Sequence, residues 1–205
     1  MGFYGNTSLS FINLPKLISL GTSVFKGIST SMTINLPIYS DIGFITTSSY
    51  AAKENINKLT IGILECPDVS INARPFSGWT LLSELTLPSC SYIGDYYFFT
   101  HKCLTTINAP ACSSIGSNTF ANAERLTTIN LANCQVIGDY AFSSCSVLTT
   151  ISLPGCTTIG VGAFCSCPLL SSVFLPKCIS INSNAFVNCS SLTNINLPMC
   201  QSVSS

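Results

Sequence analysis

Hydrophobic and polar residues alternate in short runs along the chain, and a clear example is LTTINL at residues 126–131. Ile129 and Leu131 are apolar, whereas Thr128 and Asn130 are polar. Alternation with a period of two predicts a β-strand that buries one face and exposes the other. The small Ala132 follows, where most of the related runs have proline, and the strand is expected to end there. Each run therefore predicts one short, half-buried strand.

These runs recur with a 22-residue period. Five 22-residue segments align without gaps, and they begin at Leu82, Leu104, Leu126, Leu148 and Leu170. A sixth segment starts at Leu192 and reaches Ser205. Upstream, Phe3 and Phe25 keep the same phase, but the interval from Ile42 to Ile71 exceeds the period by seven positions. We therefore expect about nine coils, with one seven-residue insertion between residues 43 and 62.

A 22-residue unit is too short to bury a core by itself, so the copies must stack on one another. We predict that residues 1–205 form a single solenoid in which each coil adds one short strand to a parallel β-sheet. Gly138 would permit a turn with a positive φ angle, and Ala141-Phe142 would begin a helical, 3₁₀ or irregular return leg. Equivalent side chains would then form ladders through the core. The expected ladders are Ile93, Ile115, Ile137, Ile159 and Ile181, and Phe98, Phe120, Phe142, Phe164 and Phe186.

The repeated motifs LxxIxLPxC and IGxxAFxxC resemble those of the BspA-like (Treponema-type) leucine-rich repeat family. The resemblance extends over nearly the whole chain, because the motifs recur in register. It implies a right-handed, curved leucine-rich repeat solenoid with the sheet on its concave face. It also implies an extracellular or cell- or virion-surface location and an adhesive or structural role. The family has no shared catalytic residues, so none can be assigned here.

Charged residues make up only 8% of the chain, and 8 basic residues balance 8 acidic ones. Such a chain cannot neutralise a row of phosphates, so nucleic acid is not an expected partner. No apolar run approaches the roughly 18 residues that a membrane-spanning helix needs, so membrane insertion is not expected either.

The outward strand positions carry Ser, Thr and Asn, and they form a candidate concave binding face. Its residues are Thr106, Asn108, Thr128, Asn130, Thr150, Ser152, Ser172, Phe174, Asn194 and Asn196. This face could bind a host-surface protein or a glycan, or it could be a soluble, uncharged surface without a ligand. Ice binding by a threonine ladder is disfavoured, because Ser and Asn interrupt the ladder and the solenoid should be curved. Phe174 is the aromatic residue that stands out on this face.

Twelve cysteines and a single histidine are the residues that could carry chemistry. One line of cysteines follows the 22-residue period, at Cys90, Cys112, Cys134, Cys156, Cys178 and Cys200, and a second comprises Cys145, Cys167 and Cys189. A row of thiols differs from the tetrahedral convergence of a zinc site, so no metal or cofactor is expected. We expect buried free thiols that pack as small hydrophobic residues. His101 occupies the position of Cys145 in a later coil, so we interpret it as a packing residue and the protein as non-catalytic.

The expected insertion carries several charged residues in a chain that has few. It is predicted to bulge from the flank of the solenoid and to form a lateral contact. Its candidate contact residues are Tyr50, Lys53, Glu54 and Lys58.

Neither end of the sequence resembles a polar capping repeat, which solenoids normally use to cover their last coil. Residues 192–205 number 14 and residues 1–8 number eight, so the two ends together amount to one 22-residue unit. We therefore expect head-to-tail assembly of copies into a filament; the alternative is a segment of a longer surface adhesin. The candidate junction residues are Gly2, Phe3, Leu9, Ile195, Leu197, Cys200 and Val203.

Overall fold

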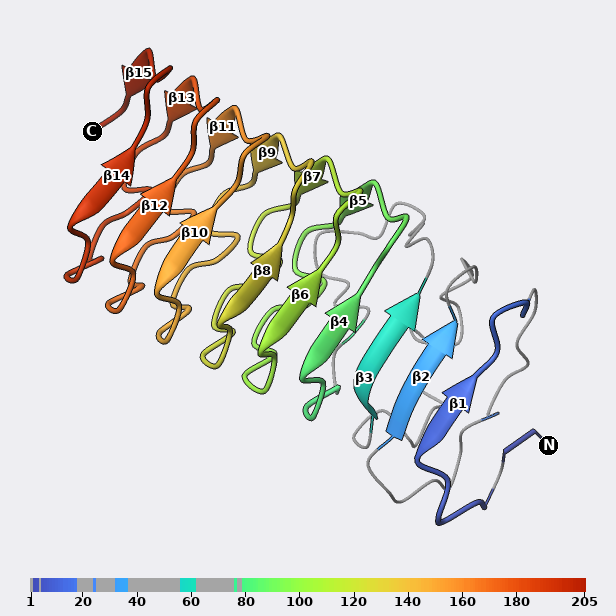
Figure 1. The fold of residues 1–205 in the computed structure, drawn as a ribbon. Coiled ribbons are helices and arrows are strands. Elements are labelled where there is room, and N and C mark those ends of the chain that lie inside the picture. The colour runs from blue at the N-terminus through green and yellow to red at the C-terminus, as the bar shows by residue number, and fades with distance from the viewer. Residues whose placement is uncertain are drawn as a thin grey trace.

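The computed structural model describes residues 2–3, 5–17, 24, 32–36, 56–61, 76 and 79–205. Within these residues the chain forms a solenoid of short parallel strands that lie side by side in an elongated array (Figure 1). The strands that carry the LTTINL-type runs are β1 (Phe11–Asn13), β2 (Met32–Leu36), β3 (Ile56–Ile61), β4 (Glu84–Thr86), β6 (Thr106–Asn108), β8 (Thr128–Asn130), β10 (Thr150–Ser152), β12 (Ser172–Phe174) and β14 (Asn194–Asn196).

From residue 79 onward each coil carries a second, very short strand in addition to the expected one. These strands are β5 (Tyr92–Ile93), β7 (Ser114–Ile115), β9 (Val136–Ile137), β11 (Thr158–Ile159), β13 (Ser180–Ile181) and β15 (Ser202–Val203). They form one continuous sheet in the order β15-β13-β11-β9-β7-β5. The longer strands form two sheets, β1-β2-β3-β4-β6-β8 and β10-β12-β14. From β4 onward every strand pair has the 22-residue interval, as in Thr106↔Thr128 and Ser172↔Asn194, which confirms the repeat register; β8 and β10 belong to different sheets.

The register near the N-terminus differs from the single seven-residue insertion that the sequence suggested. Thr33 pairs with Lys58, and Lys58 in turn pairs with Glu84. These two intervals exceed the 22-residue period by three and by four positions, so the extra residues are divided between two successive coils. Part of the expected insertion, Ile56–Ile61, is a regular strand of the sheet, with a register shift just after Met32.

The return legs are irregular, and no helix occurs among the described residues. In residues 79–205, two residues of each return leg have φ angles between 55° and 62°, which interrupt any helical path. They are Tyr96, Thr100, Asn118, Asn122, Tyr140, Ser144, Gly162, Ser166, Asn184 and Asn188.

The expectation of a positive φ angle at Gly138 is wrong, because the described glycines with positive φ are Gly5 and Gly162. Gly138 is instead required by close contact between coils. A Cβ atom there would lie 2.7 Å from the carbonyl carbon of Gly116 and 2.8 Å from the carbonyl oxygen of Ile115. Gly160 meets Gly138 in the same way, with the nearest backbone atom at 2.6 Å. The repeated glycine therefore allows the backbones of successive coils to approach each other.

The core is built from the expected ladders. Phe98, Phe120, Phe142, Phe164 and Phe186 form a continuous stack whose successive ring centroids lie 5.3–5.5 Å apart. Four of these rings are fully buried, but Phe186 is only partly buried, because residues 192–205 add two strands and no return leg that could cover it. The same change from buried to partly buried occurs along the cysteine line, between Cys178 and Cys200.

Candidate functional site: the main sheet face and the C-terminal end

The outward residues of β4, β6, β8, β10, β12 and β14 form what we call the main sheet face. All ten residues predicted for the concave face lie on these strands and are exposed or partly buried. Asn130 donates an amide hydrogen bond of 2.7 Å to the Oδ1 atom of Asn108, and on the preceding strands β2 and β1, Asn35 makes the same contact with Asn13 at 2.8 Å. Part of the hydrogen-bonding capacity of this face is therefore used between neighbouring coils.

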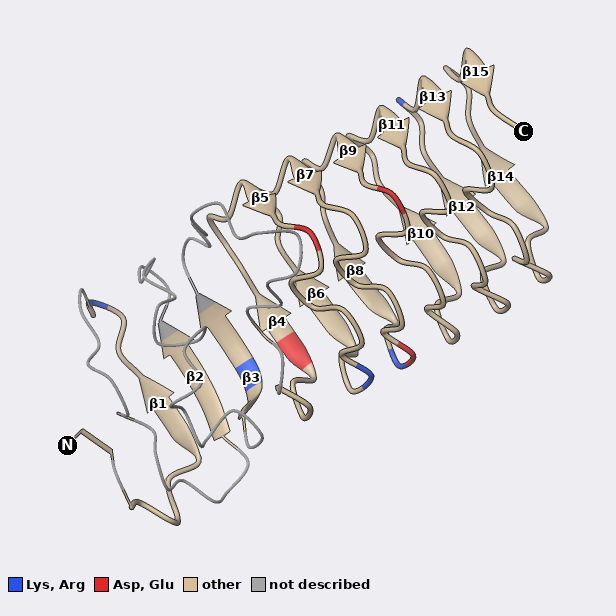
Figure 2. Ribbon diagram, turned by 180° about the vertical axis from the view of Figure 1, so that it is seen from behind, with Lys and Arg blue, Asp and Glu red and all other residues tan. Residues whose placement is uncertain are grey.

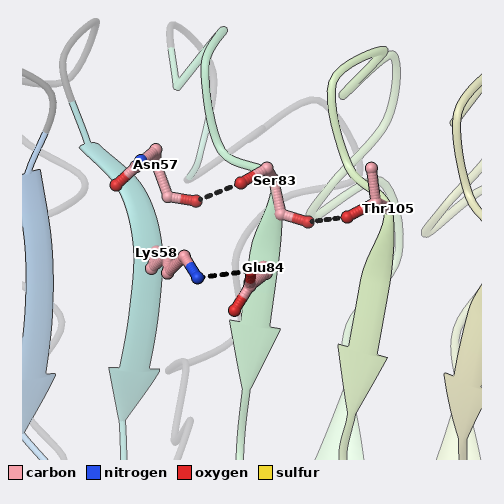
Figure 3. A network of polar contacts seen from close by, with 5 residues as sticks. All are labelled: Asn57, Lys58, Ser83, Glu84 and Thr105. Atoms are coloured by element: carbon pink, nitrogen blue, oxygen red, sulfur yellow. Dashed lines mark hydrogen bonds and ion pairs between the residues drawn. The ribbon is translucent and has the colours of Figure 1, made fainter.

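Hydroxyl groups just before the strands also connect successive coils. Ser83 donates to the carbonyl oxygen of Asn57 at 3.0 Å, and Thr105 donates to that of Ser83 at 2.9 Å (Figure 3). Ser171 and Thr193 repeat this contact farther along the chain. The abundance of Ser and Thr in the repeat therefore has a structural cause, since these side chains pair with backbone groups of the preceding coil.

Charge is sparse on the solenoid, as Figure 2 shows. Lys58 and Glu84 form an ion pair across β3 and β4, with 2.5 Å between Nζ and Oε1 (Figure 3). Lys58 therefore lies within the sheet and not in a lateral bulge. The other lateral candidates, Tyr50, Lys53 and Glu54, lie outside the described residues.

Phe174 is the most exposed large apolar side chain on the main sheet face. It is 44% exposed, and its strand neighbours in register are Ser152 and Asn196. Exposed aromatic residues surrounded by small polar ones are typical anchors of protein-binding surfaces.

His101 is buried and serves the packing role that its position in the repeat suggested. Its Nε2 atom lies 3.0 Å from the carbonyl oxygen of Phe76, and Cys167 and Cys189 donate their thiols to the equivalent carbonyls of Phe142 and Phe164. Burial lowers the pKa of His101, so the ring is neutral and donates one hydrogen bond. The other ring nitrogen, Nδ1, lies 3.3 Å from the carbonyl oxygen of Phe99, so the shorter contact at Nε2 favours the tautomer in which His101 replaces a thiol as the donor to the preceding coil.

The described cysteines are all free thiols. Burial raises the pKa of Cys112 to about 11 and those of Cys134 and Cys156 to about 12. Each of these three thiols donates to a backbone carbonyl two residues later. In the part of the chain that the structure describes, no cluster of His, Cys, Asp or Glu could hold a metal ion, and no helix is long and apolar enough to cross a membrane.

The last coil exposes the apolar positions that each following coil covers elsewhere. Ile195 is 43% exposed and Val203 is 68% exposed, whereas their counterparts Val173 and Ile181 are 1% and 4% exposed. Leu197 and Cys200 are partly buried. β14 and β15 are also the last strands of their sheets, so each presents an unpaired backbone edge.

The other predicted junction residues lie at the opposite end of the array (Figure 1). Phe3 and Leu9 are partly buried against the core, and Gly2 is exposed. The backbone N–H of Phe3 donates to the carbonyl oxygen of Val24 at 2.9 Å, just as that of Phe142 donates to Ala163 at 2.8 Å. Phe3 therefore occupies the return-leg position of a coil in the solenoid register.

The repeat geometry agrees with the comparison to known families. The family model for the BspA-type leucine-rich repeat region matches residues 1–98 and 69–193, with six copies of the repeat. The chain belongs to this family. No curated protein matches the sequence.

Two solved structures show the same architecture. A leucine-rich cell surface protein from Faecalibacterium prausnitzii is 25% identical with a TM-score of 0.54, over 61% of this chain and 41% of that one. A leucine-rich repeat protein from Bacteroides ovatus is 19% identical with a TM-score of 0.62, over 96% of this chain and 48% of that one. The chain thus spans less than half the length of either protein.

Proposed function

We propose that this BspA-type solenoid is a non-catalytic, structural segment at a cell surface that associates end to end with further copies. The observation that carries the proposal is the uncovered last coil, where Ile195 and Val203 are exposed beside the free edges of β14 and β15. Burial of apolar surface and pairing of strand edges both favour association at this end. The surface location is supported by the family and by the similar cell surface protein from Faecalibacterium prausnitzii.

The partner surface is the N-terminal return leg of a second copy. The last coil provides β14 and β15, and Phe3 already has the backbone register of a return leg. Docking of the two would place Phe3 of the second copy on the phenylalanine stack that ends at Phe186 of the first. The strands β14 and β15 of the first copy and the N-terminal return leg of the second would then together form one complete coil. Because the two surfaces differ, the contact repeats without closing and produces a filament.

Sedimentation velocity over a range of protein concentrations tests the proposal, with electron microscopy of the concentrated sample. We expect species that grow with concentration, and we expect Val203→Asp to prevent the growth by burying a charge at the junction. Val136→Asp is the matched control, because Val136 is 41% exposed on β9 in the middle of the solenoid. A wild-type protein that stays monomeric at every concentration contradicts end-to-end assembly.

A second candidate is adhesion, which the exposed ring of Phe174 favours. Here the main sheet face would bind a host-surface protein or glycan, with Phe174 as the anchor. Immobilised extracellular-matrix proteins and glycans provide the probes. Phe174→Ser should abolish any binding found, whereas Leu169→Ser, which removes a 48% exposed side chain outside the strands, should not. Equal loss in both variants, or binding that neither affects, contradicts this role of the face.

A further inference from the structure

The main sheet is interrupted between β8 and β10, well inside the solenoid. All residues from 79 to 205 are described, and the long strands on either side of this junction belong to different sheets. At the preceding junction, the amides of Thr127 and Thr128 both donate to the carbonyl oxygen of Thr105 at 3.0 Å. At the following junction, Ser171 and Ser172 donate to Thr149.

The corresponding bonds between β8 and β10 are missing at both ends of the strands. Among residues 79–205, the amides of Thr149 and Thr150 have no backbone acceptor on Thr127, and the amide of Leu131 has none on Ser152. The equivalent amide of Leu153 donates to Phe174 at 3.1 Å. The two strands therefore leave backbone donors and acceptors unpaired along a seam inside the array.

Side-chain burial independently shows that the seam is open. Ile129 is only partly buried, although its counterparts Ile107 and Ile151 in the adjacent coils are 0% and 3% exposed. An open depression of about 620 Å³ lies beside the seam, just past the C-terminal ends of β8 and β10. Its lining from the two coils includes Ala132, Asn133, Gln135, Pro154, Gly155 and Thr157.

The rest of the junction is closed and can act as a pivot. β9 and β11 pair in register, and Gly160 donates to the carbonyl oxygen of Ile137 at 2.8 Å. On the return leg, Phe142 donates to Ala163 at 2.8 Å. The coils can therefore separate along the main sheet face without losing their contacts on the other sides.

We propose that the seam between β8 and β10 accepts an extended polypeptide strand from a partner. Only a second main chain presents N–H and C=O groups with the spacing of a strand edge, and strand addition is a common mode of peptide recognition. A strand in the seam would cover Ile129 with its inward side chains and join the two sheets. The depression lacks an aromatic residue on which a sugar ring could stack, which favours a peptide over a glycan.

The partner segment should be uncharged and rich in β-branched and small polar residues. The depression is lined by neutral residues apart from Lys177, and the strands that border the seam carry only Thr, Ile, Asn and Ser. A charged strand would have to bury its charge beside Ile129 without a counter-ion. The proposal does not depend on end-to-end assembly, because the seam lies far from both ends of the array (Figure 1).

Hydrogen exchange with a synthetic peptide tests the seam, and the peptide LTTISLP copies residues 148–154 as a suitable strand. In the free protein we expect the amides of Thr149, Thr150 and Leu131 to exchange about tenfold or more faster than those of Ser171, Ser172 and Leu153. The peptide should slow exchange at the first three amides only. A peptide with methylated backbone nitrogens at alternate residues should have no effect.

A pair of crosslinked variants tests whether the peptide binds between β8 and β10. Thr128→Cys/Thr150→Cys, bridged by a short thiol-reactive linker, should hold the seam closed and abolish the effect of the peptide. Thr106→Cys/Thr128→Cys bridges a junction that is already paired and should leave the effect intact. Equal protection of the two sets of amides in the free protein overturns the proposal. Fast exchange that the peptide does not change at millimolar concentration also overturns it and identifies the seam as a hinge alone.

Discussion

Single residues in this solenoid are selected by their contact with the preceding coil. The glycine of the Ile-Gly motif recurs from coil to coil because the backbone of one coil lies against the next. At Gly138 the nearest atoms to an added Cβ would all belong to backbone, which cannot move aside as a flexible side chain could. His101 and the equivalent thiols illustrate the same rule for hydrogen-bond donors.

Gly138→Ala should therefore destabilise the protein by about 1–3 kcal/mol, the usual cost of overpacking. Urea unfolding followed by circular dichroism measures the change. Gly155→Ala is the control, because a Cβ atom there would lie no closer than 3.2 Å to its neighbours and Ala111 already occupies the equivalent position. Equal stability of Gly138→Ala and the wild type would mean that the coils are not in close contact at this position.

Substitutions of His101 distinguish the contribution of its packing to stability from the effect of its protonation. His101→Ala should cost about 1–3 kcal/mol, because it removes a buried ring and its contact with the carbonyl of Phe76, which keeps the amide of Trp79 as a donor. His101→Cys should restore part of that stability. The pKa of His101 is lowered in the folded state, so protonation favours unfolding. The contribution of neutral His101 to the free energy of unfolding is fully present above the unfolded-state pKa of about 6.5, and it is lost as the pH falls below that value. The urea midpoint should thus fall between pH 7.5 and 5.5 in the wild type and change less in His101→Cys.

At the scale of an element, each coil from residue 79 onward consists of a short strand and a second, still shorter strand, joined to the next coil by an irregular return leg wherever one follows. None of these elements is stable alone. Stability comes from ladders in which one side chain of each coil stacks on its equivalent in the next. The phenylalanine and cysteine ladders are buried wherever a further coil covers them and become partly exposed at the last rungs, Phe186 and Cys200. The reactivity of the cysteine thiols should therefore increase from the buried rungs to the last rung of the ladder.

Thiol labelling of the folded protein measures this gradient. Cys134 and Cys156 should react slowly with a maleimide at pH 7, because they are buried and burial raises their pKa to about 12. Cys200, on the last coil, should react first among the cysteines of its ladder. Mass spectrometry after brief labelling identifies the modified sites. Rapid modification of Cys134 in folded protein would contradict the buried ladder.

At the scale of the whole molecule, a solenoid contacts only its sequence neighbours, so local stability depends on distance from an open end. The C-terminal coil is covered on one side only, whereas the coil that contains β11 and Phe164 is covered on both. The interrupted sheet at the β8–β10 seam adds a second weak position in the interior of the array.

Hydrogen exchange in dilute protein should show this profile directly. We expect the amide of Ser204, which donates to Ile181, to exchange faster than that of Gly160, which donates to Ile137. If copies assemble end to end, protection of Ser204 should increase with protein concentration, whereas protection of Gly160 should not change. Uniform protection along the array at low concentration would show that the end coil is as stable as the interior.

The sequence by itself determined the period, the positions of the longer strands and the identity of the core ladders, but not the second short strand of each coil from residue 79 onward. A 22-residue repeat leaves few choices, because equivalent residues of stacked coils must lie beside each other, and the observed pairing of Thr106 with Thr128 follows directly. The outward positions of the main sheet face follow from the same alternation. The buried role of His101 was also predictable, since the repeat places it in line with Cys145 and Cys167.

Only the tertiary structure decided how the coils meet. The division of the seven extra residues between two coils depends on strand register, which a count along the sequence cannot resolve. The role of Gly138 depends on the distance between two backbones and not on its own φ angle. The seam separates two 22-residue segments that begin with the same residues, LTTI, so local sequence does not mark it. These features arise from contacts between coils, and such contacts are properties of the stacked array that no single repeat encodes.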